Sequence, residues 1–226
     1  MHELTRIKIG GYELQALQQK RKMQDGISRI VQRLGGEAEE SIITAAYRYL
    51  ERSKGNSGKN EDGFQSKEKE AQILIPFIEQ NHLWFDFDHF SLFLDEGAEQ
   101  KVFIDTSINK VLKLNDAIYY ANWTQYFESL LIHNLLFPTT KYNLLGFLQL
   151  NKTLFAVLNQ EYIKPTAPTN IESIRKLMLE NGFVIKKNND YIHESLGLVI
   201  EDLHEENVLT HNDVLFFIDT VIYLFD

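Results

Sequence analysis

The chain contains no cysteine among its 226 residues. Disulfide bonds, thiolate catalysis and cysteine-based zinc sites are therefore excluded. The absence is compatible with a cytoplasmic protein, which is the location we expect. No stretch approaches the roughly 20 apolar residues that a membrane-spanning helix needs, and the N-terminal segment has no apolar core of signal-peptide length. We therefore expect no membrane partner.

Positive charge is also scarce, because the 23 lysines and arginines are outnumbered by 32 acidic residues, which gives a formal net charge of −9. This balance argues against a broad nucleic-acid-binding surface, which would need a basic face. Two catalytic signatures are missing as well: the H-E-x-x-H pair of helix-borne zinc sites and the G-x-S-x-G turn of acyl-transfer serines. By contrast, 44% apolar residues are enough to build a core.

Apolar residues recur at helical spacing over residues 12–34, 42–50, 67–81, 116–137 and 170–182. Short β-type runs occupy 100–106, 110–116, 141–163, 197–200, 207–209 and 215–219. Because the two kinds of element are segregated rather than strictly alternating, the pattern predicts an α+β fold. A Gly-, Ser- and Asn-rich stretch ends near residue 66. It predicts an N-terminal helical region with its linker over 1–66 and a second domain over 67–226.

The segment GLVIEDLHEENVLTHNDVLFFID, residues 197–219, places a set of polar residues between apolar strands. Asp202, His204 and Asn207 can face one another across a tight loop. THND then predicts a hairpin turn, so that the returning strand brings Asp219 close to Asn207. A hard cation such as Mg²⁺ takes carboxylate and amide oxygens, and Asp202 is left to accept a proton from an attacking hydroxyl. The alternative is an acidic loop with this spacing by chance.

The DLHEENVL block is similar to the D-L-K/H-x-x-N-V-L catalytic loop of the protein-kinase-like superfamily, and FFID resembles its metal-binding strand. The blocks EGAEQKVFID, KVLKLND, YFESLLIHNLLFP and LLGF, in this order, resemble the kinase-like domain of bacterial and phage polyvalent proteins over roughly residues 67–221. The resemblance implies a protein-kinase-like N-lobe β-sheet with a helix and a truncated, minimal C-lobe. An N-terminal helical region would precede them.

The resemblance also implies roles for the catalytic loop in an ATP- and Mg²⁺-dependent kinase. Asp202 would be the base, and Asn207 and Asp219 would be the metal ligands. His204 would lie near the transferred phosphate. The acceptor would be a hydroxyl of a protein Ser, Thr or Tyr, or of a small molecule, and nothing in the sequence decides between them.

Upstream residues complete the implied nucleotide site. Lys113 would contact the α- and β-phosphates, and Glu128 would be its acidic partner on the following helix. Glu161 and Ile163 would face adenine through their backbone groups, at the hinge between the lobes. The alternatives are a solvent-facing strand lysine for Lys113, as expected for Lys110, and a solvated helix residue for Glu128.

Three departures limit the resemblance. The glycine-rich loop keeps only Gly97, and Ile200-Glu201 stands where protein kinases have His-Arg. The sequence also ends at Asp226, shortly after the expected metal-binding Asp219, so we expect no activation segment. A catalytically inactive module that binds nucleotide or a partner chain is therefore the second hypothesis. An interaction protein with accidental matches is the third.

Overall fold

The computed structural model describes residues 8–9, 12–13, 41–56, 66–86, 93–96, 100–105, 109–187 and 189–224. The chain forms two compact units. The five-stranded unit comprises residues 33–131 and 142–162, and the C-terminal unit comprises 1–32, 132–141 and 163–226. The chain last passes from one unit to the other between residues 162 and 163. The predicted hinge over this segment stays a prediction.

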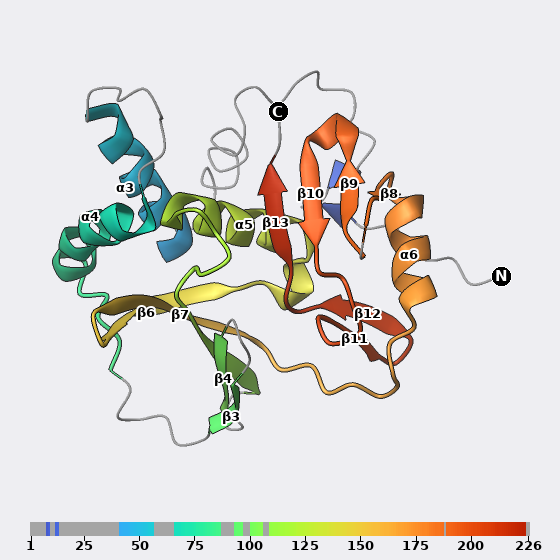
Figure 1. Ribbon diagram of the computed structural model, residues 1–226. Helices are drawn as coiled ribbons and strands as arrows, with labels where there is room; N and C mark the ends of the chain where they lie inside the picture. Colours follow the sequence, from blue (N-terminus) through green and yellow to red (C-terminus); the bar gives the residue numbers. More distant parts are fainter. Residues whose placement is uncertain are drawn as a thin grey trace. The chain divides into compact units, whose positions relative to one another are not determined.

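The five-stranded unit is built on one antiparallel sheet with the order β3-β4-β5-β7-β6, so β5 is the central strand (Figure 1). Its strands are β3 (Phe93–Glu96), β4 (Gln100–Asp105), β5 (Lys110–Asn115), β6 (Asn143–Leu150) and β7 (Thr153–Glu161). Its helices are α3 (Ile42–Asn56), α4 (Lys67–Gln80) and the first part of α5 (Trp123–Leu136). The helices α3 and α4 pack against each other.

The side chains of alternate strand residues point to the same side of a sheet, and on one side of this sheet they are apolar. Leu112 and Leu114 of β5 are buried with Val157 of β7, and Phe85 and Phe155 pack against them. Lys113 lies between the two leucines in sequence, so it projects from the opposite face. The strand therefore places a lysine side chain at the centre of the sheet.

The segment after α4 runs beside the edge strand β6. Phe85 N–H donates to the carbonyl of Phe147 at 2.8 Å, and Phe147 N–H donates to the carbonyl of Leu83 at 2.8 Å. A bulge interrupts the register of β6 between Leu144 and Gly146. A Cβ atom on Gly146 would lie 2.4 Å from the Leu83 carbonyl oxygen, so only glycine permits this close approach.

The C-terminal unit contains a four-stranded antiparallel sheet with the order β13-β10-β9-β8 and a separate β11-β12 hairpin (Figure 1). Its strands are β8 (Val184–Ile185), β9 (Tyr191–His193), β10 (Leu198–Glu201), β11 (Val208–His211), β12 (Val214–Phe217) and β13 (Val221–Leu224). It also holds the end of α5, the short helices η1 (Pro138–Thr140) and η2 (Glu194–Leu196), and α6 (Ile171–Glu180). The small pair β1 (Lys8–Ile9) and β2 (Tyr12–Glu13) belongs to the same unit.

The mixture of helices and antiparallel sheets confirms the α+β prediction. Asn170 caps α6 as predicted, because its side-chain oxygen accepts the N–H of Glu172 at 2.8 Å. The predicted helix over 12–34 is wrong at its start. Residues 12–13 form β2, whose backbone groups pair with β1, and the remainder lies outside the described residues.

The kinase-like lobes and the domain boundary near residue 66 stay predictions. Among the described residues, no helix combines the length and apolarity that crossing a bilayer would require.

We predict that Gly146→Ala destabilises the protein by about 1–3 kcal/mol, because the added methyl would meet a backbone carbonyl that no side-chain rotation can clear. Urea denaturation measures the change. Gln149→Ala, at an exposed position of the same strand, is the matched control for replacement by alanine in β6. An increase in stability, as expected for an unhindered Gly→Ala change, would contradict the prediction.

Candidate functional site

Two irregular segments lie side by side in the C-terminal unit. Residues 202–207 connect β10 to β11, and residues 218–220 connect β12 to β13. The strand registers place them opposite each other, because Glu201 pairs with Val221 on one side and Val208 pairs with Phe217 on the other. Three of the residues that the sequence predicted to act together, Asp202, Asn207 and Asp219, are therefore on adjacent segments.

Asn207 closes the first of these segments through its side-chain amide. Its Nδ2 donates to the backbone carbonyl of Asp202 at 3.0 Å and to the Asp202 Oδ2 at 2.9 Å. Asp202 has φ 64°, a left-handed conformation that costs most residues energy and that aspartate tolerates better than most. A strained residue of this kind persists only where its surroundings hold it, and such residues cluster at functional sites.

His204 orients the other oxygen of the same carboxylate. Its Nε2 lies 3.1 Å from Asp202 Oδ1, and its Nδ1 lies 3.2 Å from the backbone nitrogen of Glu206. Because the Glu206 N–H can only donate, Nδ1 accepts this hydrogen bond. Nε2 also lies 3.2 Å from the side-chain nitrogen of Asn207. The Asp202 side chain is nevertheless 46% exposed, so a substrate could reach its carboxylate.

Asp219 is held against Asn207 through the backbone. The N–H groups of Ile218 and Asp219 donate to the Asn207 carbonyl at 2.9 and 3.4 Å. Since the Asn207 amide nitrogen is committed to Asp202, its Oδ1 is the atom suited to a cation. One amide oxygen and one carboxylate fit the donor set of Mg²⁺, which completes its shell with phosphate oxygens and water.

Within the described part of the chain, no group of three or more histidine, aspartate or glutamate side chains could hold a metal ion. Glu201 lies beside the same loop. Burial and then the nearby carboxylates of Asp190 and Asp202 raise the pKa of Glu201 above its ordinary value.

Lys113 on β5 is buried, with 3% of its surface exposed, so the alternative of a solvent-facing strand lysine is wrong. Its ammonium lies over the ring of Tyr142, 5.3 Å from the centroid. Lys110 behaves as the surface residue that the sequence predicted, and its Nζ pairs with Glu161 Oε1 at 2.7 Å. A buried ammonium is costly unless it is paired or hydrogen-bonded.

Glu128 lies on α5 in an environment that disfavours its charge. Burial and then the Glu51 carboxylate raise the pKa of Glu128 to about 7, and Lys54 partly opposes the shift. Both charged neighbours belong to α3, and Lys113 is not among the groups that shift this pKa. The pairing of Glu128 with Lys113 therefore stays a prediction.

The start of α5 is fixed by Glu70 of α4, a residue that the sequence analysis missed. Glu70 is fully buried, and its carboxylate accepts the backbone N–H of Thr124 at 2.8 Å and the Thr124 hydroxyl at 2.9 Å. A carboxylate at a helix N-terminus also interacts favourably with the helix dipole. Lys54 of α3 lies 3.7 Å from the same carboxylate, so α3 and α4 together position α5.

Of the remaining predicted nucleotide contacts, the structure describes Glu161 and Ile163. Glu161 ends β7 opposite Lys110, and Ile163 begins the part of the C-terminal unit that follows the crossover. Gly97 lies outside the described residues. Adenine recognition by this segment stays a prediction.

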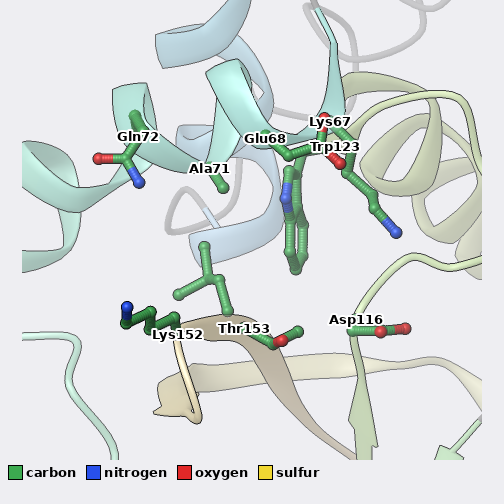
Figure 2. Close-up of a pocket in the computed structure, with 9 residues that line it drawn as sticks. Lys67, Glu68, Ala71, Gln72, Asp116, Trp123, Lys152 and Thr153 are labelled. Atoms are coloured by element: carbon green, nitrogen blue, oxygen red, sulfur yellow. The ribbon is translucent and has the colours of Figure 1, made fainter.

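A pocket of about 330 Å³ lies within the five-stranded unit, and none of its lining residues is a predicted site residue. Its lining residues come from α4, from the start of α5 and its approach, and from the turn between β6 and β7 (Figure 2). Figure 2 shows the ammonium groups of Lys67 and Lys152 extending in opposite directions rather than toward a common point. These two ammonium groups therefore do not converge on one ligand.

Comparison with known proteins agrees with the resemblance noted above. A protein-family model described as "Serine/Threonine/Tyrosine Kinase found in polyvalent proteins" matches residues 67–226, which is more than half of the chain. No curated protein matches the sequence. Helix α3, with Lys54 and Glu51, lies before the matched region.

We predict that Glu128→Gln stabilises the protein above pH 7 but not below pH 4.5. Between pH 4.5 and about 7 the folded chain binds more protons at Glu128 than the unfolded chain, so wild-type stability from this site falls as pH rises. Glutamine does not titrate, so above pH 7 the free energy of unfolding of the variant should exceed that of the wild type by about 3 kcal/mol. Urea midpoints at several pH values measure it. Glu180→Gln, at an exposed helix position, is the control, and an equal effect at every pH would contradict the prediction.

Proposed function

Because the chain belongs to the family of serine/threonine/tyrosine kinases found in polyvalent proteins, we propose that it is a phosphotransferase that uses ATP and Mg²⁺. The observation that carries the proposal is the loop of residues 202–207, closed by Asn207 on Asp202 and held against Asp219. This arrangement supports a base and a pair of oxygen ligands on adjacent segments.

In the proposed reaction the acceptor hydroxyl oxygen forms a bond to the γ-phosphorus, and the bond from that phosphorus to the bridging oxygen of ADP breaks. The hydroxyl proton passes to the Asp202 carboxylate. Asn207 donates to one oxygen of this carboxylate, and His204 Nε2 lies 3.1 Å from the other, which supports an orienting role for both. His204 thus acts on Asp202 in addition to lying near the transferred phosphate.

Bound Mg²⁺ would neutralise the negative charge that develops on the phosphate oxygens. Asn207 Oδ1 and the Asp219 carboxylate are the ligands that we assign to it. Lys113 is assigned to the α- and β-phosphates, and its burial in the central strand supports this role. The acceptor is a protein Ser, Thr or Tyr hydroxyl or a small-molecule hydroxyl, and we propose adenine contacts by the backbone of Glu161 and Ile163.

A catalytically inactive nucleotide-binding or partner-binding module is the second candidate. It is favoured by Glu128, because the charged groups that shift its pKa, Glu51 and Lys54, lie on α3. The variant Asp202→Asn separates the two, because asparagine tolerates the left-handed backbone and leaves the proposed metal ligands in place. If the chain is an enzyme, the variant should keep nucleotide binding and lose 10²-fold or more of its rate of ATP consumption. If the chain is an inactive module, neither the wild type nor the variant should consume ATP.

We predict that ATP with Mg²⁺ raises the melting temperature, and that neither alone does so to the same extent. A ligand at a hundredfold excess over its Kd stabilises the folded state by about 2.7 kcal/mol. Asp219→Asn should abolish the metal-dependent part of the shift. Asp213→Asn removes a charge from the exposed turn of the same hairpin and should leave it intact. No shift at millimolar ATP and Mg²⁺ would contradict the proposal.

A further inference from the structure

The segment that follows Ile163 is restricted by proline. Two of the four prolines in the chain, Pro165 and Pro168, lie within the stretch KPTAPT of residues 164–169. Each proline ring fixes its own φ at about −65° and moves the preceding residue to extended backbone. The stretch therefore has little conformational freedom, and we call residues 164–169 the spacer segment.

The spacer segment runs antiparallel to β11. Ala167 forms a backbone bridge with Thr210. The Thr166 N–H donates to the Thr210 carbonyl at 2.9 Å, and the hydroxyl oxygens of Thr169 and Thr210 lie 2.9 Å apart. The spacer segment thus extends the β11-β12 hairpin on the side of β11.

Two further hydrogen bonds reach the turn of this hairpin. His211 Nδ1 lies 2.7 Å from the backbone carbonyl of Lys164 and donates to it, because a carbonyl can only accept. The Asn212 N–H donates to the hydroxyl oxygen of Thr166 at 2.8 Å. Residues 164–168 are exposed, so the attachment depends more on these hydrogen bonds than on buried apolar surface.

The spacer segment and the hairpin each lead to one part of the proposed nucleotide site. Ile163, whose backbone is the proposed adenine contact, directly precedes the spacer segment. Asn207 directly precedes β11, and Asp219 follows β12 by two positions. Because the spacer segment is stiff and hydrogen-bonded to β11, the distance from Ile163 to these two residues is defined before a ligand binds.

We propose that the spacer segment sets the distance between the adenine contact at Ile163 and the metal ligands, with Thr166 as its positioning residue. Thr166 holds β11 through its N–H and the turn through its hydroxyl. The inference rests on the proposed function, because it takes Ile163 as an adenine contact and Asn207 and Asp219 as metal ligands. A preorganised distance raises the affinity for a ligand that spans both sites and leaves unchanged the affinity for one that occupies the metal site alone.

Thr166→Val and Thr166→Ser form the matched pair that tests the proposal. Valine removes the hydroxyl that accepts the Asn212 N–H, whereas serine keeps it. Titration calorimetry with excess Mg²⁺ measures the Kd of ADP and the Kd of pyrophosphate, which has no adenine. Valine should weaken ADP binding about fivefold, the equivalent of one hydrogen bond, whereas serine should stay within about twofold of wild type. Neither substitution should change the Kd of pyrophosphate.

Pro165→Ala combined with Pro168→Ala is the second variant, because neither proline takes part in the hydrogen bonds described above. The double substitution keeps those bonds and lets the two φ angles vary. Loss of preorganisation should weaken ADP binding about two- to fivefold. The Kd of pyrophosphate should again stay at the wild-type value.

ADP affinity that stays at the wild-type value in both variants would overturn the spacing role and leave the proposed function standing. Equal losses for ADP and pyrophosphate would also overturn the spacing role, because they would indicate damage to the metal site itself. Failure of the wild-type protein to bind ADP with Mg²⁺ would overturn both the spacing role and the proposed function.

Discussion

The side-chain amide of Asn207 is the interaction on which the candidate site depends. It holds the backbone and the carboxylate of Asp202 at once, and so maintains a left-handed residue whose conformation costs on the order of 1 kcal/mol. The Asn207 carbonyl meanwhile accepts the N–H groups of Ile218 and Asp219. One residue thus sets the shape of its own loop and the distance to the neighbouring segment, and its remaining oxygen is the atom that we propose as a metal ligand.

The helices impose a second constraint, which concerns buried charge. Glu70 and Glu128 are carboxylates in low-dielectric surroundings, and burial raises the pKa of both. Lys54 is the cation near them, and it lies on α3, outside the part of the chain that matches the kinase family. Burial of a carboxylate that is only partly compensated by Lys54 lowers stability at pH values where it is charged. Helix α3 therefore supplies charged groups that affect the buried carboxylates on and next to α5.

The sequence could predict the local parts of this structure. The β11-β12 hairpin follows from two apolar runs around a turn at Asn212 and Asp213, residue types that tolerate the left-handed backbone found there. Alternation within KVLKLND predicts a lysine on β5, but whether Lys113 faces solvent depends on what covers the sheet. The contacts of His133 with Thr220 and of Glu70 with Thr124 join residues far apart in sequence. Hydrophobic periodicity contains no signal for such pairs.

The measurement that tests the central claim most directly is a crystal structure with ADP and Mn²⁺, in which anomalous scattering locates the metal. The account predicts a manganese peak at coordination distance, about 2 Å, from both Asn207 Oδ1 and an Asp219 carboxylate oxygen. The metal should also bind a phosphate oxygen of the nucleotide. Nucleotide and metal bound elsewhere, with Asn207 and Asp219 free of both, would contradict the account.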